Sequence, residues 1–140
     1  MEVVTQDERT LTELDHVRLQ RLIHGPGETW ATRLGCPIDG VLDAAEQVPS
    51  RQVPADVVTM YSQVELIDLA SHRRYCLTVC YPSDAEPALG FVSVLSPVGA
   101  SLIGRRVGSI ARWRTPSGGQ GAAEVGALLF QPEASGDYTT

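Results

Sequence analysis

Two closely spaced acidic residues are the first candidates in this sequence for a joint chemical role. Asp84 and Glu86 lie two residues apart in the segment CYPSDAEPALG, which directly follows a predicted strand. Two carboxylates at a strand end can in principle offer oxygen ligands to a divalent cation. The alternative is a solvated loop in which Ser83 or Asp84 caps a turn, a common role of these residue types. We favour the solvated loop.

Catalytic and metal-binding patterns of other kinds are missing from the sequence. It contains no Ser-His-Asp spacing, nucleophile elbow, phosphate-binding loop or dinucleotide-binding glycine motif. Its three histidines are scattered, and its three cysteines form no metal-type pair. Cys36, Cys76 and Cys80 are predicted to be buried free thiols, and strand alternation places Cys76 and Cys80 on one face. We therefore predict a protein that is not an enzyme and that needs no metal ion or cofactor.

The composition is that of a globular chain with a negative charge. The 140 residues are 43% hydrophobic and 20% charged, and the formal net charge is −6 at pH 7. No apolar run approaches the roughly 18 residues of a membrane span, and the acidic N-terminus lacks a secretory signal, so we expect a cytoplasmic location. The net charge disfavours non-specific binding of nucleic acid. The paired cations Arg73-Arg74 and Arg105-Arg106 are either solvated or dock an acidic protein surface.

Helical spacing of apolar residues dominates the first third of the chain. It predicts one helix over residues 11–23, with Thr12 or Asp15 as N-cap, and a second over residues 38–48. The segment HGPGETW (residues 24–30) contains two glycines and a proline and breaks the pattern. Residues 1–48 are therefore predicted to form a short antiparallel helical hairpin, a coiled coil. The proline-rich residues 49–55 are predicted to be a linker.

After the linker the period changes to the alternation that is typical of strands. Residues 57–69 and 73–81 are predicted to pair as a hairpin, and three more strands are expected within residues 91–95, 109–114 and 122–130. The segment TPSGGQG (residues 115–121) is a predicted loop. We expect residues 56–140 to form an α+β domain, an antiparallel sheet with one short helix packed on one face.

The short helix is predicted within the segment SPVGASLIGRRVG (residues 96–108). Ser96 ends a strand, and Pro97 has its φ angle fixed for a first helical turn. Gly99 and Ala100 are small enough to let the helix lie close to the sheet, where Leu102 and Ile103 would cover the core. The rigid Ser96-Pro97 corner is a candidate contact point for a partner, because it loses little conformational entropy on binding.

Several motifs together resemble one protein family. PADVVTM, TVCYP, SPVGASLIGRRVG and FQPEASGDY are similar to the C-terminal domain of the bacterial GreA/GreB transcript-cleavage factors, and the resemblance runs from about Val48 to Tyr138. It implies an FKBP-like domain attached to a coiled-coil hairpin, and binding to RNA polymerase near its secondary channel. The residues that correspond to the polymerase-binding segment of the family are Ser96, Pro97, Val98, Gly99 and Ala100.

The same resemblance bears on the hairpin tip. In the Gre factors a long coiled coil carries two acidic residues that help to hold a metal ion in the polymerase active site. Here each predicted helix has at most about 17 residues, on the order of 25 Å, and the tip offers only Glu28. We therefore expect a polymerase-binding regulator that competes with Gre-type factors without cleaving transcripts. The alternatives are a shortened cleavage factor and an FKBP-like prolyl isomerase or chaperone.

Overall fold

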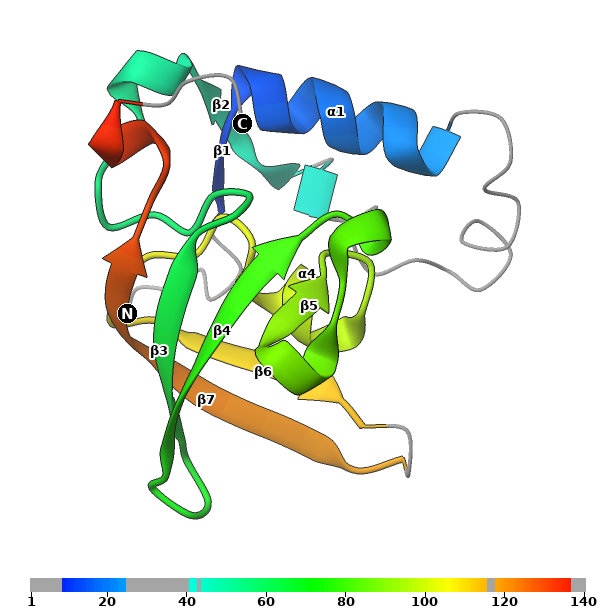
Figure 1. Cartoon of the computed structure of the whole chain (residues 1–140), viewed down its shortest axis with the longest axis vertical. Coiled ribbons are helices and arrows are strands. Elements are labelled where there is room, and N and C mark those ends of the chain that lie inside the picture. The colour runs from blue at the N-terminus through cyan, green and yellow to red at the C-terminus, as the bar shows by residue number, and fades with distance from the viewer. Residues whose placement is uncertain (1–8, 25–40, 43, 116–117, 137–140) are drawn as a thin grey trace, which may run out of the picture.

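The fold is α+β, and a strongly twisted, curled sheet occupies its centre (Figure 1). The computed structural model describes residues 9–24, 41–42, 44–115 and 118–136. The predictions for Glu28, for the rest of the segment 24–30 beyond His24, and for Cys36 lie outside these residues. No helix in the described ranges is long and apolar enough to cross a membrane.

The sheet has five strands in the order β5-β4-β3-β7-β6. Their bounds are Gln63–Asp68 for β3, Arg74–Cys80 for β4, Phe91–Ser93 for β5, Ile110–Arg114 for β6 and Gln120–Phe130 for β7. The β3–β4 hairpin and the three later strands are confirmed, but β3 begins only at Gln63, and residues 57–62, predicted as part of it, contain a turn in which the Ser62 N–H donates to the Thr59 carbonyl at 3.0 Å. In Figure 1 the tip of the hairpin projects away from the rest of the molecule, at the end opposite to helix α1.

One strand departs from the predicted antiparallel sheet. β5 pairs with β4 in parallel, with Thr78 opposite Phe91 and Cys80 opposite Ser93. Two 3-10 turns, Pro82–Asp84 and Pro87–Leu89, lie in the connection and carry the chain back along β4. The physical reason is that this connection is long enough to bring the chain back to Thr78, so that β5 runs in the same direction as the last residues of β4, whereas a tight turn would have forced an antiparallel pair.

The N-terminal part is less helical than predicted. β1 (Thr10–Thr12) precedes α1 (Glu13–His24), and β2 (Glu46–Val48) pairs in parallel with β1. Both predicted helices are therefore wrong at one end. Backbone hydrogen bonds to distant segments hold these residues as strands. The Thr10 N–H donates to the Gly104 carbonyl at 3.0 Å, and the Glu46 N–H donates to the Arg9 carbonyl at 3.0 Å. Such partners override local helical spacing.

The predicted N-cap of the first helix is confirmed for Thr12. Its hydroxyl accepts a hydrogen bond from the backbone N–H of Asp15 at 3.0 Å. From this start α1 runs along one end of the sheet, as Figure 1 shows. Leu11, Leu19 and Ile23 are buried in the same hydrophobic cluster as Val64 and Leu66 of β3. The first part of the chain thus contributes to the core of the sheet.

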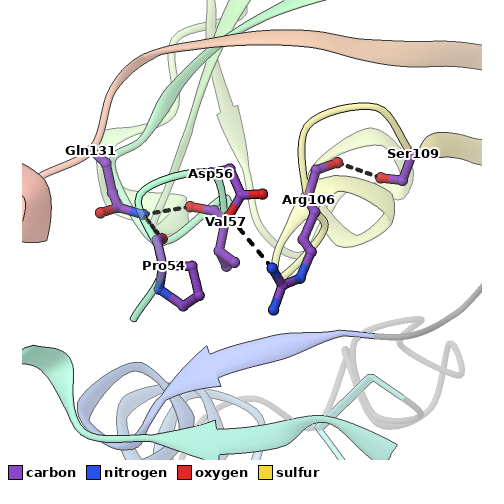
Figure 2. Close-up of polar contacts among 6 residues, drawn as sticks. All are labelled: Pro54, Asp56, Val57, Arg106, Ser109 and Gln131. Carbon is purple, nitrogen blue, oxygen red and sulfur yellow. Dashed lines mark hydrogen bonds and ion pairs between the residues drawn. The ribbon is translucent and has the colours of Figure 1, made fainter. Parts of the chain in front are cut away.

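The segment before β3 is fixed from two sides (Figure 2). The Gln131 side-chain amide donates to the carbonyls of Pro54 and Val57 at 2.8 and 2.7 Å. The Arg106 guanidinium pairs with Asp56 at 3.6 Å. Residues 54–57, at the end of the predicted linker, are therefore held by fixed contacts to the sheet domain.

Candidate functional site

The predicted contact corner lies at the start of α4 (Pro97–Leu102). Ser96 is its N-cap: the hydroxyl accepts from the Gly99 N–H at 3.1 Å and donates to the Ser93 carbonyl at 2.6 Å. Pro97, the first helical residue, is exposed. Capping and the proline ring together restrict the backbone here, so the corner is presented to solvent in one conformation.

The five residues of the predicted contact segment fall into two groups. Ser96 and Val98 are half-buried and Pro97 is exposed, whereas Gly99 and Ala100 are buried. A Cβ atom at Gly99 would lie 2.0 Å from the Ser93 carbonyl oxygen, so only glycine allows this approach of helix and strand. Leu102 and Ile103 are fully buried, as predicted for core residues. Ser96, Pro97 and Val98 are therefore accessible to a partner. Gly99 and Ala100 are not, and their small size lets α4 pack close to β5.

A hollow lies beside this corner. Its volume is about 320 Å³, and it is lined by Pro97, Ala100 and Ser101 of α4 and by Arg112, Trp113 and Arg114 of β6. Arg9 and Val41, from the N-terminal part of the chain, complete the lining. We call it the α4–β6 hollow. Its size is at the lower end for small-molecule pockets, and it is also large enough for one or two side chains of a partner.

Two arginines close the end of α4 and were not predicted to do so. Arg9 donates through Nη1 to the carbonyls of Ala100 and Ile103, both at 2.9 Å, and Arg105 donates through Nε to the Ser101 carbonyl at 2.6 Å. Cations at a helix C-terminus satisfy carbonyls that lack partners in the helix. Arg105 is 4% exposed, so its predicted place on a solvated or docking surface is wrong. Arg106 is exposed, as predicted.

Arg112 and Arg114 differ from these two. They are exposed on one face of β6, and within the described parts of the chain neither side chain has a hydrogen bond or ion pair. Trp113, between them, points to the other face and covers Gly121 of β7, where a Cβ would lie 2.5 Å from the indole nitrogen. The alternation in SIARWR could have indicated this pair of arginines on a common face.

A buried polar cluster joins α1 to the segment before β3 and to the 3-10 turn Glu133–Ser135 after β7. Asp15, 1% exposed, accepts from the Met60 N–H at 3.2 Å through Oδ2, and Oδ1 has no hydrogen-bond partner among the described residues. Glu133, 7% exposed, accepts from the Thr59 hydroxyl at 2.7 Å. Burial raises the pKa of Asp15 to about 7, and the charge of Glu133 adds to this effect. The Asp15 carboxyl therefore changes between its protonated and its ionised form near neutral pH.

The acids and thiols singled out above do not assemble into a reactive site. Asp84 lies in an exposed 3-10 turn and accepts a hydrogen bond from the Tyr61 hydroxyl. In the described ranges no three His, Cys, Asp or Glu side chains come close enough to hold a metal ion. Cys80 is a buried free thiol as predicted, but Cys76 is exposed. The reason is that β5 covers β4 only from Thr78 to Cys80.

Comparison with known proteins places the chain in a family. Residues 53–127 match the family described as "Transcription elongation factor, GreA/GreB, C-term". The "Regulator of nucleoside diphosphate kinase" of Escherichia coli K12 is 36% identical over 132 residues, which cover 91% of this chain and 93% of that protein. "Transcription elongation factor GreA" of Acidiphilium cryptum is 30% identical over 93 residues, which cover 66% of this chain and 59% of that one.

A solved structure agrees with the sequence comparisons. The "Prokaryotic transcription elongation factor GreA/GreB from Nitrosomonas europaea" superimposes with a TM-score of 0.69 and 28% identity, covering 88% of this chain and 98% of that one. The matched family region contains β3 to β6, α4 and most of β7, and hence the Ser96-Pro97 corner and most of the α4–β6 hollow. The chain therefore belongs to the GreA/GreB family of transcription elongation factors and is similar over most of its length to a regulator of nucleoside diphosphate kinase.

Proposed function

We propose that this protein is a transcription regulator that binds RNA polymerase near the secondary channel through its sheet domain. The observation that carries the proposal is the Ser96-Pro97 corner. It stands at the position of the family's polymerase-binding segment, it is accessible, and it is fixed by the Ser96 cap. We further propose the division into residues 1–48, a linker at 49–55 and an FKBP-like domain at 56–140, with the first unit as a short coiled-coil hairpin and with cytoplasmic location.

The bound protein does not cleave transcripts itself. α1 has 12 residues, which is about 18 Å of helix at 1.5 Å per residue. The predicted tip carries the single acid Glu28. One carboxylate supplies too few ligands for Mg²⁺, which otherwise keeps its waters. The protein therefore acts by occupying the docking site and competing with Gre-type factors. Its effect on nucleoside diphosphate kinase, inferred from the Escherichia coli relative, is indirect and arises through transcription.

The docking proposal is tested by equilibrium binding of the full chain to core RNA polymerase. Pro97→Ala should weaken binding by about tenfold, because hydrophobic contacts of a central interface residue commonly contribute more than 1 kcal/mol. Pro49→Ala is the matched control, since Pro49 is also exposed and precedes a short helix. It should leave the affinity unchanged. Equal affinities of the two variants would contradict the assignment of the corner, and no binding by the unmodified chain would contradict the function itself.

The claim that the protein does not cleave RNA has its own experiment. Added to a backtracked elongation complex, the full chain should release no short RNA 3′ fragments. It should also slow the cleavage that an added Gre factor stimulates, increasingly with its own concentration. Fragment release without any Gre factor, abolished by Glu28→Ala, would identify the protein as a shortened cleavage factor.

A further inference from the structure

The five-stranded sheet has one face towards the core and one face that reaches solvent. Leu66 of β3, Ala123 of β7 and Ala111 of β6 are buried in the core cluster. Successive side chains of a strand point to opposite faces, so the residues next to these three belong to the other face, which we call the outer sheet face. The strand registers align one row of this face across β4, β3, β7 and β6: Arg74, Ile67, Glu124 and Ile110.

Arginines stand on both sides of the outer sheet face. Arg112 and Arg114 of β6 flank Trp113, which packs against the core, so both point to the outer face, and both are exposed. Within the described residues neither has a hydrogen bond or ion pair. Arg74 of β4 is exposed as well, and its ion pair with Glu65 is long, at 3.9 Å. Three strand spacings separate β4 from β6, which is about 14 Å.

Between these arginines the outer sheet face is partly apolar. Ile67, Ala122 and Ile110 are half-buried. The Ile67 side chain lies over Gly126, where a Cβ atom would be 3.0 Å from the Ile67 Cδ1 atom. The water-facing side of an antiparallel sheet usually carries polar residues at such positions. This apolar stripe between cations is therefore a surface that a partner can cover.

The two hairpins that form this face differ in charge from the rest of the chain. Residues 63–80 and 109–126 contain four arginines and three acids, whereas the other residues contain seven arginines and fourteen acids. One of the three acids, Asp68, is engaged at the hairpin tip, where it accepts from the Ala70 N–H at 3.2 Å and from the Ser71 hydroxyl at 2.8 Å. Charge complementarity therefore favours an anionic partner at this face.

We propose that the outer sheet face binds an acidic amphipathic helix of a partner protein, with apolar side chains on the stripe and carboxylates on Arg74 and Arg112. An α-helix with its side chains is about 10–12 Å wide, so it fits between arginines that stand about 14 Å apart. Guanidinium groups bind carboxylates in a defined, bidentate geometry. Glu124 lies within the row, so the bound helix is expected to carry one basic side chain at that point.

This inference goes beyond the proposed function. α4 packs on the core side of β6, where Leu102 shares the core cluster with Ala111. The side chain of Arg112 points to the other side of the strand. The Ser96-Pro97 corner and the outer sheet face are therefore different surfaces, and each can be changed without the other.

Nucleic acid is a less favourable occupant of this face. The stripe is apolar, and Glu124 in the middle of the row would repel phosphate groups. The chain as a whole has a formal net charge of −6, which opposes binding of a phosphate backbone. A helix with acidic flanks satisfies the stripe and the arginines together.

The main experiment measures binding of a synthetic helical peptide to the full chain by calorimetry. The probe has about 18 residues, on the order of 27 Å of helix, with leucines along one side and glutamates on both flanks. Arg74→Glu and Arg112→Glu should each weaken its binding by about fivefold or more, because each replaces attraction by repulsion. The same peptide with glutamine in place of glutamate should bind the unmodified chain more weakly by a similar factor.

Arg73→Glu is the matched control for Arg74→Glu. Arg73 is adjacent in sequence and also exposed, but it pairs with Asp68, which lies opposite the buried Ala123 and so on the other face. Its charge reversal should change the affinity for the peptide by less than about twofold in about 0.1 M salt, which screens charges that are not in contact. Equal affinities of the Arg73 and Arg74 variants would overturn the inference.

The isoleucine methyl groups report where the peptide binds. The chain has five isoleucines. Ile67 and Ile110 lie on the outer sheet face, whereas Ile23 and Ile103 are buried in the core. In methyl NMR spectra of the full chain the peptide should shift the signals of Ile67 and Ile110 and leave those of Ile23 and Ile103 in place. Shifts at Ile103 without shifts at Ile67 would put the peptide at another site and contradict the proposal.

The remaining outcomes also decide the proposal and keep it separate from the proposed function. Absence of peptide binding overturns it, and so does a single-stranded RNA oligonucleotide, or self-association of the chain, that depends on Arg112 in place of the peptide. Pro97→Ala should leave peptide binding unchanged, so a failure of polymerase docking does not affect this test. Thermal unfolding of each variant checks the fold, and if Arg112→Glu unfolds, Arg112→Gln decides.

Discussion

The α4–β6 surface and the polar cluster beside α1 differ in the exposure of their ionisable groups. On the first, Arg112 and Arg114 face solvent without a partner among the described residues, and in the second, Asp15 is sealed from solvent beside Glu133. Exposed charges contribute little to stability but are available to a binding partner. A buried carboxyl lowers the stability of the fold when it is ionised without a partner, and it is tolerated when it is protonated or hydrogen-bonded. The comparison teaches that stability and binding can be changed separately in this protein.

The largest expected effect comes from the buried side of α4. Gly99→Ala would place a Cβ 2.0 Å from the Ser93 carbonyl oxygen, and α4 would have to move away from β5. We expect a loss of several kcal/mol of unfolding free energy, comparable to the roughly 2–5 kcal/mol of a Leu102→Ala core truncation. Thermal and urea unfolding measure it.

Gly119→Ala is the matched control for that variant. Its added Cβ would meet the Thr115 hydroxyl oxygen at 3.4 Å, an ordinary contact. This change should alter stability by about 0.5 kcal/mol or less. Equal stabilities of the Gly99 and Gly119 variants would show that α4 does not depend on close packing against the strand.

The next effect concerns Asp15 and has a defined dependence on pH. The pKa of Asp15 is raised from 3.8 to about 7, so the folded state binds the proton more tightly than the unfolded state. The stability that this proton contributes is fully present below about pH 4 and is lost as the pH rises towards 7, at up to about 1.4 kcal/mol per pH unit.

Asp15→Asn should remove most of this dependence. The amide oxygen can still accept from the Met60 N–H, and no charge is buried at high pH. We expect the variant to be more stable than the unmodified chain at pH 8 and to differ little from it at pH 5, while polymerase affinity stays the same. Parallel stability curves for the two proteins between pH 4 and 8 would contradict the neutral, buried carboxyl.

The smallest of these effects concerns the cap of α4. Ser96→Ala removes the acceptor of the Gly99 N–H and should cost about 1 kcal/mol of stability. Ser96→Asp keeps a capping oxygen and should cost less. Binding should follow exposed Pro97 and not the cap, so Ser96→Asp should retain more polymerase affinity than Pro97→Ala. If the two serine variants unfold at the same temperature, the cap does not fix the corner.

Local pattern was sufficient for much of the sheet and for α4. Alternation predicted β3 and β4, because the side chains of a strand point to opposite faces in turn. Ser96 followed by Pro97 predicted the start of α4, because capping and a fixed φ angle act within a few residues. Leu102 and Ile103 were predicted as core from their hydrophobicity alone.

Tertiary structure decided what depends on contacts between distant residues. Four features are of this kind, and no local sequence pattern indicates them. They are the pairing of β2 with β1, the parallel pairing of β5, the burial of Arg9 and Arg105 against α4, and the proximity of Asp15 to Glu133. The sequence by itself determined periodicity, caps and family membership. Which arginines are buried and which are exposed depends on where the helix and strand ends meet, because desolvation and hydrogen bonding depend on all the groups that surround a charge.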